Sequence, residues 1–206
     1  RGFVTRGRGI SVHRADCSSL QELMRRVPER LIEAQWGDAP GARLVIEPAA
    51  KNTAPAIALA AALLPEDAVM LVCPSDHHIA DPAAFRAAAL AAAALAREDY
   101  LVSFGIAANR PETGYGYLRR GEPLAGGYAI RQFVEKPDLA RAEAYLASGE
   151  YSWNGGIFAF RAGHLLAELA AHRPEMAQAV RDAVAAGHTD GRRFHPAPAP
   201  FAAITG

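Results

Sequence analysis

The chain has 206 residues, of which 50% are hydrophobic and 21% are charged, and its formal net charge is zero. This composition suits one sizeable core, and it lacks the basic surplus that attracts nucleic acids or anionic membranes. The longest apolar run is shorter than the ~20 residues of a membrane-spanning helix, Arg1 to Gly9 has no signal-peptide pattern, and the cysteines predict no disulfide framework. We therefore expect a cytoplasmic protein that binds neither nucleic acid nor membrane, and the composition leaves its oligomeric state open.

The first 37 residues lack the alternation of strands and helices that is predicted for the rest of the chain. Residues 18–32 predict a polar amphipathic helix interrupted by Pro28, and residues 38–41 read Asp-Ala-Pro-Gly, which is typical of a linker. We therefore expect a domain boundary here. The expected parts are a fragment over 1–37, a linker over 38–42 and the main domain over 43–206.

From residue 43 onward, short apolar strands alternate with helices. Strands are predicted at 43–47, 69–73 and 101–105, and helices near 53–64 and 83–97. Asn52 or Thr53 is a plausible N-cap for the first of these helices. Strands connected by helical crossovers run parallel in a sheet that is covered on both faces. We therefore expect an α/β fold in which these three strands are parallel neighbours in one sheet.

After Gly105 the strand candidates are shorter and separated by glycines. Strands are predicted at 113–118, 128–135 and 157–160, and short helices at 138–148 and 163–172. Residues 195–200 alternate proline with small residues, so this stretch is expected to be extended or disordered.

Asp76 directly follows the second predicted strand. In open α/β sheets, ligands gather outside the carboxyl ends of the strands, and a carboxylate there can hold Mg²⁺. The alternative is an aspartate that caps a helix or stabilises a turn. His77 and His78 come next, but no third ligand stands at a zinc-like spacing, so solvated or packed histidines fit them better.

Three further motifs predict contacts with a ligand, each with a structural alternative. Lys136 ends a predicted strand and can contact a phosphate, or it can form a surface ion pair of little stability. Asn154 can bind sugar hydroxyls or belong to an ordinary turn. Gly114-Tyr115-Gly116-Tyr117 can let the backbone approach a ligand closely, or form a glycine-rich hairpin.

Six motifs in order resemble bacterial mannose-1-phosphate guanylyltransferases, a family in which a carboxy-terminal cupin domain with mannose-6-phosphate isomerase activity is often fused. The motifs are Glu47-Pro48, Asn52-Thr53-Ala54-Pro55-Ala56-Ile57, Pro74-Ser75-Asp76-His77, Glu112-Thr113-Gly114-Tyr115-Gly116-Tyr117, Phe133-Val134-Glu135-Lys136-Pro137 and Trp153-Asn154-Gly155-Gly156-Ile157-Phe158.

The resemblance implies a Rossmann-like mixed or parallel sheet of the nucleotide-sugar transferase type, truncated at both ends. It implies transfer of GMP from GTP to mannose 1-phosphate, which gives GDP-mannose and pyrophosphate. Asp76 would bind Mg²⁺ and Lys136 the sugar phosphate, both as catalytic residues. The resemblance places Glu47, Pro48, Asn52, Thr53 and Ala54 at the nucleotide, and Gly114, Tyr115, Gly116, Glu135 and Asn154 at the sugar.

Two segments of the family are absent from this sequence. One is the glycine-rich loop Gly-Gly-x-Gly-Thr-Arg-Leu-x-Pro-Leu-Ser-Arg, which cradles the triphosphate, and residues 5–9 lack its continuation. The other is the Ser-Ile-Asp-Tyr segment, whose aspartate is the expected second metal ligand. We therefore expect this chain to have little or no guanylyltransferase activity.

Residues 1–37 resemble the regulatory region of (p)ppGpp synthetase/hydrolases. His13 and Cys17 match two ligand positions of its small zinc-binding domain, which would make half a site. Two alternatives to a mannose enzyme therefore stay open. One is a nucleotidyltransferase for another sugar, and the other is a non-enzymatic fusion or fragment with a stringent-response regulatory piece.

Overall fold

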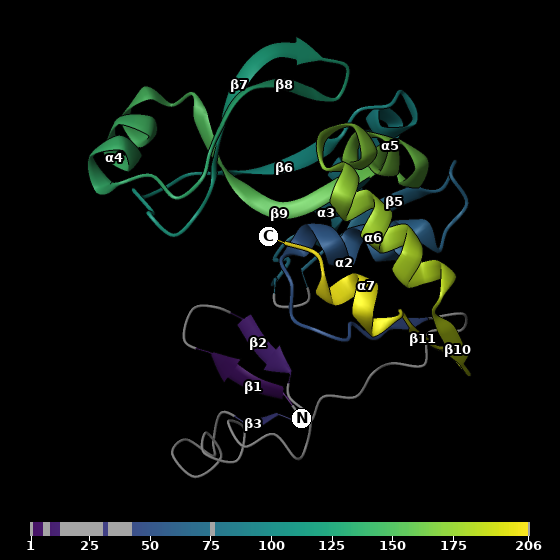
Figure 1. The fold of residues 1–206 in the computed structure, drawn as a ribbon. Coiled ribbons are helices and arrows are strands. Elements are labelled where there is room, and N and C mark those ends of the chain that lie inside the picture. The colour runs from purple at the N-terminus through teal and green to yellow at the C-terminus, as the bar shows by residue number, and fades with distance from the viewer. Residues whose placement is uncertain (1, 6–8, 13–30, 33–42, 75–76, 206) are drawn as a thin grey trace. The chain divides into compact units, whose positions relative to one another are not determined.

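The structure, a computed structural model, describes residues 2–5, 9–12, 31–32, 43–74 and 77–205 (Figure 1). The chain divides into two compact units, one of residues 1–42 with 73–82 and one of residues 43–72 with 83–206. In the first unit, strand β1 (Gly2–Thr5) pairs antiparallel with β2 (Gly9–Val12) and with β3 (Leu31–Ile32).

The prediction of a helix over residues 18–32 is wrong at its end, because Leu31 and Ile32 form β3. Pairing with a strand distant in sequence decided this, which a local helical pattern does not reveal. The rest of that helix, the linker at 38–42, and His13 and Cys17 lie outside the described residues.

The second unit contains most of the described helices and strands. In chain order they are β4 (Leu44–Val45), α2 (Thr53–Ala62), β5 (Val69–Val72), α3 (Pro82–Arg97, beginning in the first unit), β6 (Val102–Ala107), β7 (Tyr117–Leu124), β8 (Gly127–Val134), α4 (Leu139–Ser148), β9 (Tyr151–Arg161), α5 (Ala162–His172), α6 (Pro174–Ala185), β10 (His188–Asp190), β11 (Arg193–His195) and α7 (Pro198–Ala202). The predicted mixed α/β fold is confirmed, with helices at all four positions predicted after residue 43.

The main sheet is built around β9. Its order is β5-β9-β7-β8, and β6 pairs with the opposite edge of β9; every one of these pairs is antiparallel. The prediction that 43–47, 69–73 and 101–105 are adjacent parallel strands is therefore wrong. Strands β5 and β6 run in the same direction, but β9 separates them. Residues 44–45 belong to a separate sheet, where β4 pairs parallel with β11.

A register shift interrupts the pairing of β6 with β9. Ser103 pairs with Phe158, whereas Gly105, two residues later, pairs with Asn154, four residues away on β9. The extra residues of β9 include Gly156, whose φ of 66° lies in the left-handed region that favours glycine. The sequence pattern showed only the end of this strand, at 157–160, because the glycines conceal its first half.

Helices cover both faces of the sheet, as the alternation of side chains along β9 requires. Ala159 is buried against Ala92 and Ala96 of α3. Its neighbours Phe158 and Phe160 point to the opposite face, where α2 and α5 lie. Figure 1 shows α2, α5, α6 and α7 grouped together, whereas α4 stands apart beyond the β7–β8 ribbon.

The end of the chain folds onto α2, against the prediction that residues 195–200 are extended or disordered. Strand β11 continues to His195, and α7 begins at Pro198, where proline is tolerated because the first helical turn lacks N–H partners. Phe201 is fully buried in a cluster with Leu59 and Val180. No helix in the described part of the chain is long and apolar enough to cross a membrane.

Candidate functional site

Gly116 lies at the centre of the residues predicted to bind the sugar. It immediately precedes β7, and a Cβ atom at this position would lie 2.9 Å from Glu135 Oε2 and 3.1 Å from Phe133 Cζ. Asn154 Cβ is 3.4 Å from the same point. The structure therefore brings Gly116, Glu135 and Asn154 together, and the absence of a side chain at Gly116 permits this close approach.

The backbone fixes both Asn154 and Lys136 to the same short segment. The N–H of Asn154 donates to the carbonyl oxygen of Gly116 over 2.7 Å, and the N–H of Lys136 donates to the carbonyl oxygen of Tyr115 over 3.2 Å. Lys136, predicted at the sugar phosphate, and Asn154, predicted at the sugar, therefore lie close together, whereas Asp76 lies outside the described residues.

Lys136 has a strained backbone at the end of β8. Its φ is 44°, in the left-handed region, which costs a residue with a side chain on the order of 1 kcal/mol or more. The ammonium group lies 3.3 Å from Glu135 Oε1, and both side chains are more than half exposed. Such an exposed ion pair contributes little to stability, so the pairing does not by itself account for the strain.

The loop before Gly116 is organised by its own hydrogen bonds. The N–H of Glu112 donates to the hydroxyl oxygen of the fully buried Tyr117 over 2.9 Å, and the N–H of Gly114 donates to Glu112 Oε1 over 3.1 Å. The ring of Tyr115 meets Trp153 edge-on, with centroids 5.4 Å apart. Residues 113–116, predicted as part of a strand, instead form this loop, and the strand begins at Tyr117.

The residues predicted to bind the nucleotide occupy the start of α2 and the segment before it. Asn52 is the N-cap, as one of the two predictions had it, although its side chain makes no capping hydrogen bond. Glu47 and Pro48 are exposed, and partial desolvation raises the pKa of the Glu47 carboxyl above its usual value.

An apolar cavity of about 350 Å³ is lined by two of the residues predicted to bind the nucleotide. Thr53 and Ala54 line it at the start of α2, and Ser103 and Phe133 line it on the side of Gly116. The remaining lining residues are Ile57, Ala58, Leu101, Val102, Phe158, Phe160, Leu165 and Leu169. The cavity therefore extends from the start of α2 to Phe133, beside Gly116, and none of the residues predicted to bind the sugar lines it.

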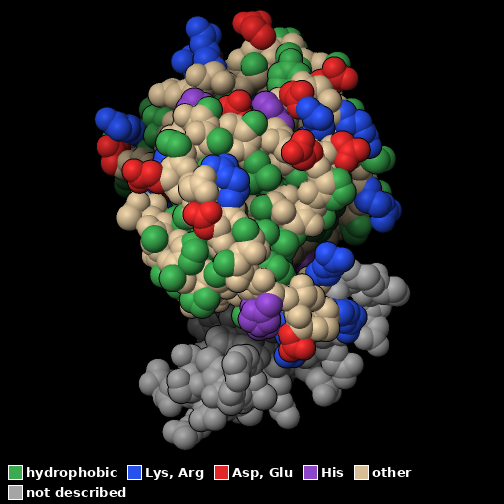
Figure 2. Space-filling view, turned by 45° about the vertical axis from the view of Figure 1, so that its right-hand side comes forward, with side chains coloured by type: hydrophobic (Ala, Val, Ile, Leu, Met, Phe, Trp, Pro, Cys, Tyr) green, Lys and Arg blue, Asp and Glu red, His purple; other side chains and the backbone are tan. Residues whose placement is uncertain are grey.

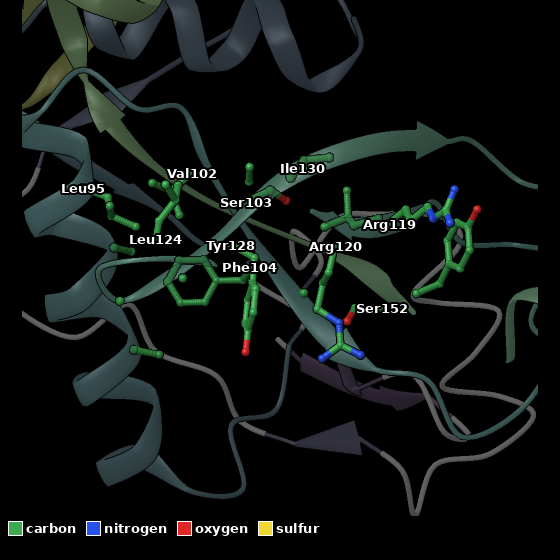
Figure 3. A pocket seen from close by; sticks show the side chains of 18 of the residues that line it. Leu95, Val102, Ser103, Phe104, Arg119, Arg120, Leu124, Tyr128, Ile130 and Ser152 are labelled. Atoms are coloured by element: carbon green, nitrogen blue, oxygen red, sulfur yellow. The ribbon is translucent and has the colours of Figure 1, made fainter. Parts of the chain in front are cut away.

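A larger pocket of about 730 Å³ lies elsewhere, between α3, β6 and the β7–β8 ribbon (Figure 3). Its two arginines are already engaged: Arg119 binds Glu150 over 2.7 Å, and Arg120 donates to the carbonyl oxygen of Gly149. None of the described residues predicted for the site lines this pocket.

Metal ligands are not gathered in the described part of the chain, where no group of three His, Cys, Asp or Glu residues is placed to hold an ion. Asp76, predicted to bind Mg²⁺, lies outside the described residues. Among the described residues, His77 and His78 belong to no such group, and their interpretation as solvated or packed histidines stays a prediction.

A family model described as nucleotidyl transferase matches residues 19–196. The chain belongs to this family. Enzymes of this kind use a divalent metal ion. The match begins within the first 37 residues, and none of the relatives described below is a (p)ppGpp synthetase. The resemblance of residues 1–37 to such proteins therefore stays a prediction.

Similar proteins come from several bacteria. The chain is 52% identical over 157 residues to a mannose-1-phosphate guanylyltransferase of Escherichia coli K12, covering 71% of this chain and 33% of that protein. It is 50% identical over 159 residues to the xanthan biosynthesis protein XanB of Xanthomonas campestris pv. campestris strain B100, covering 76% of this chain and 34% of that protein. The chain thus spans about a third of the length of these curated relatives.

Two solved structures have the same fold. A mannose-6-phosphate isomerase from Helicobacter pylori has a TM-score of 0.72 at 31% identity, covering 78% of this chain and 63% of that one. A protein from Thermus thermophilus, described as a mannose-1-phosphate geranyltransferase, has a TM-score of 0.71 at 34% identity, covering 91% of this chain and 56% of that one. These likenesses support the nucleotide-sugar transferase type of fold. Neither they nor the sequence relatives support impaired activity or a non-enzymatic role.

The sequence interpretation missed Ser103. This residue lines the apolar cavity and binds Asn154, but it stands in an ordinary apolar strand with no motif around it. The predicted strand at 101–105 placed Ser103 in a strand correctly. Its contact with Asn154 on β9 depends on the register shift, which the sequence did not reveal.

Proposed function

We propose that this chain transfers GMP from GTP to mannose 1-phosphate and releases GDP-mannose and pyrophosphate. The observation that carries the proposal is the close grouping of Glu135 and Asn154 around Gly116. A hexose presents hydroxyl groups that both donate and accept hydrogen bonds. A carboxylate accepts and a carboxamide donates, so this pair of side chains has the chemistry to orient such a ligand.

The charge of the sugar phosphate requires a local cation. On the face shown in Figure 2, Lys and Arg side chains are interspersed with Asp and Glu, and the net charge of the chain is zero. No global field therefore attracts an anion. The backbone of Lys136 is hydrogen-bonded to Tyr115, next to the Gly116 carbonyl that holds Asn154, and its ammonium group would neutralise the phosphate of mannose 1-phosphate.

The nucleotide would lie on the α2 side of the same region. We place the guanine base near Glu47, Pro48, Asn52, Thr53 and Ala54, of which the last two line the cavity that continues toward Phe133. An oxygen of the sugar phosphate would then attack the α-phosphorus of GTP. A new P–O bond forms, the bond to the bridging oxygen of the β-phosphate breaks, and pyrophosphate leaves. The residues contribute positioning and charge neutralisation, because the reaction needs little covalent chemistry from the protein.

The divalent ion of this family is proposed to be Mg²⁺, held by Asp76. When bound, Mg²⁺ neutralises charge on the triphosphate oxygens. We also propose that residues 43–206 form the transferase domain and that residues 1–37 are a separate piece.

Binding and turnover by the purified chain test the function. Calorimetric titration measures the affinity for mannose 1-phosphate, GTP and GDP-mannose in the presence of Mg²⁺, and pyrophosphate release measures turnover. We expect mannose 1-phosphate to bind and Lys136→Ala to weaken it about tenfold or more, because a hydrogen-bonded charge is removed. Arg141→Ala, which removes an exposed cation on α4, serves as the control.

The alternatives give different results in the same titrations. Equal affinity for glucose 1-phosphate and mannose 1-phosphate would assign the site to another sugar. No binding of any nucleotide or sugar phosphate would support a non-enzymatic chain and overturn the proposal.

A further inference from the structure

The side chain of Asn154 is held in one orientation by two hydrogen-bond donors. Its Oδ1 accepts from Ser103 Oγ over 2.9 Å and from the backbone N–H of Gly156 over 3.2 Å. A backbone N–H can only donate, so the atom that faces Gly156 must be the oxygen of the carboxamide. This settles which end of the amide is which, and it makes Ser103 the donor in its own bond.

The nitrogen end of the carboxamide is left free to meet a ligand. Among the described residues, Nδ2 of Asn154 donates to no acceptor, whereas Oδ1 is occupied twice. The Asn154 side chain also lies beside Gly116 and Glu135, because its Cβ is 3.4 Å and Glu135 Oε2 is 2.9 Å from the position that a Cβ of Gly116 would take. Asn154 therefore offers donors next to the Glu135 carboxylate.

The register shift between β6 and β9 is what brings Ser103 to Asn154. Ser103 pairs in the ladder with Phe158, which lies four residues beyond Asn154 on β9. In a regular ladder, the Ser103 side chain could not reach Asn154. The shift brings Asn154 closer to Ser103, because the three residues of β9 between Asn154 and Phe158 lie opposite a single residue of β6, Phe104. The contact thus depends on the same irregularity that positions the left-handed Gly156.

We propose that Ser103 is a positioning residue for the sugar: its hydroxyl locks the Asn154 carboxamide so that Nδ2 donates to a hydroxyl oxygen of the sugar phosphate. This inference rests on the proposed function. Without the hydroxyl, Oδ1 keeps only the Gly156 bond, and the amide can rotate about its last torsion, which is intrinsically broad. The donor is then no longer held toward the ligand before it binds.

The test combines ligand binding with a double-mutant cycle in the full chain. Ser103→Ala is expected to weaken mannose 1-phosphate binding about five- to tenfold, since one orienting hydrogen bond is lost, and to change GTP binding less than about twofold. Ser103→Thr restores the hydroxyl, and the cavity beside Ser103 has room for the added methyl group, so it should bind like the wild type. In an Asn154→Ala background, Ser103→Ala should have no further effect.

Ser152→Ala is the matched control. Ser152 is a second serine near the site, also on β9, and it makes no hydrogen bond through its side chain among the described residues. It should bind mannose 1-phosphate like the wild type. Equal binding by Ser103→Ala and wild type, or an undiminished effect of Ser103→Ala without Asn154, would overturn the inference.

A spectroscopic readout separates this inference from the proposed function. In ¹⁵N-resolved NMR spectra, the side-chain NH₂ signals of Asn154, identified by their loss in Asn154→Asp, should shift on Ser103→Ala and return on Ser103→Thr. If mannose 1-phosphate fails to bind even the wild type, the proposed function is wrong, and the role of Ser103 for the sugar fails with it. If the wild type binds mannose 1-phosphate but the NH₂ signals of Asn154 do not shift in Ser103→Ala, only the positioning role of Ser103 is wrong.

Discussion

The backbone N–H of Asn154 donates to the carbonyl oxygen of Gly116 over 2.7 Å, and this bond joins the central strand of the sheet to the loop before β7. The next residue back, Tyr115, accepts from the N–H of Lys136. The carbonyl groups of two consecutive residues therefore hold Asn154, proposed to bind the sugar, and Lys136, proposed to bind its phosphate. Displacing this loop should weaken the binding of both parts of the ligand.

Replacing Gly116 with alanine should block the proposed sugar site. The new Cβ would lie 2.9 Å from Glu135 Oε2, closer than Cβ atoms tolerate, so Glu135 must move. We expect mannose 1-phosphate binding to weaken about tenfold or more, since overpacking typically costs about 1–3 kcal/mol. Titration calorimetry measures the change. Gly127→Ala is the control, because its Cβ would meet only the tip of Leu95 at 3.4 Å. Equal losses in both variants would argue against a site at Gly116.

Two substitutions of Lys136 separate its charge from its strained backbone. Glycine tolerates a φ of 44°, whereas alanine does not, so Lys136→Gly should be more stable than Lys136→Ala by about 1 kcal/mol. Both lack the ammonium group and should bind mannose 1-phosphate equally weakly. Urea unfolding measures the stability difference. If the alanine variant is as stable as the glycine variant, the backbone at this position is not strained.

The hydroxyl group of Tyr117 should stabilise the loop before it. Tyr117 is fully buried and accepts the N–H of Glu112, so Tyr117→Phe leaves a donor without its partner. We expect a loss of about 1–3 kcal/mol in the free energy of unfolding, together with weaker mannose 1-phosphate binding. Tyr145→Phe is the control, because the Tyr145 ring packs against Tyr117 but its hydroxyl makes no hydrogen bond among the described residues. A stability loss of the same size in the control would show that the effect does not come from the hydrogen bond with Glu112.

Lys51 ties the segment before α2 to the end of the chain. Its ammonium group donates to the carbonyl oxygens of Ala202 and Ile204 over 2.9 and 2.6 Å. We expect Lys51→Met to lower the free energy of unfolding by about 1–2 kcal/mol. This value already allows for solvent, which weakens the exposed one of the two hydrogen bonds. Arg141→Met removes only an exposed ion pair with Asp138 and should change stability by less than about 0.5 kcal/mol. Indistinguishable urea midpoints for the two variants would contradict the role of Lys51.

The sequence by itself determined the helices that local signals specify. Helix α4 begins after Asp138, whose side chain accepts from the N–H of Arg141 as an N-cap, and it ends at Gly149 with a φ of 67°. These signals lie within a few residues of one another, so a single segment contains all the information. The ordered motifs likewise identified Gly116, Glu135 and Asn154, which the fold brings together.

The order of the strands was decided only by the tertiary structure. Strands β5 and β6 have the alternation with helices that predicts parallel neighbours, yet β9, which follows both of them at a distance in the sequence, inserts between them. Residues 195–200 form part of β11 and α7 because Phe201 gains burial against α2 and α6. Ser103 meets Asn154 for the same kind of reason. Strand pairing and burial stabilise contacts between segments that are distant in sequence. A local sequence pattern does not specify which distant segment will form the contact.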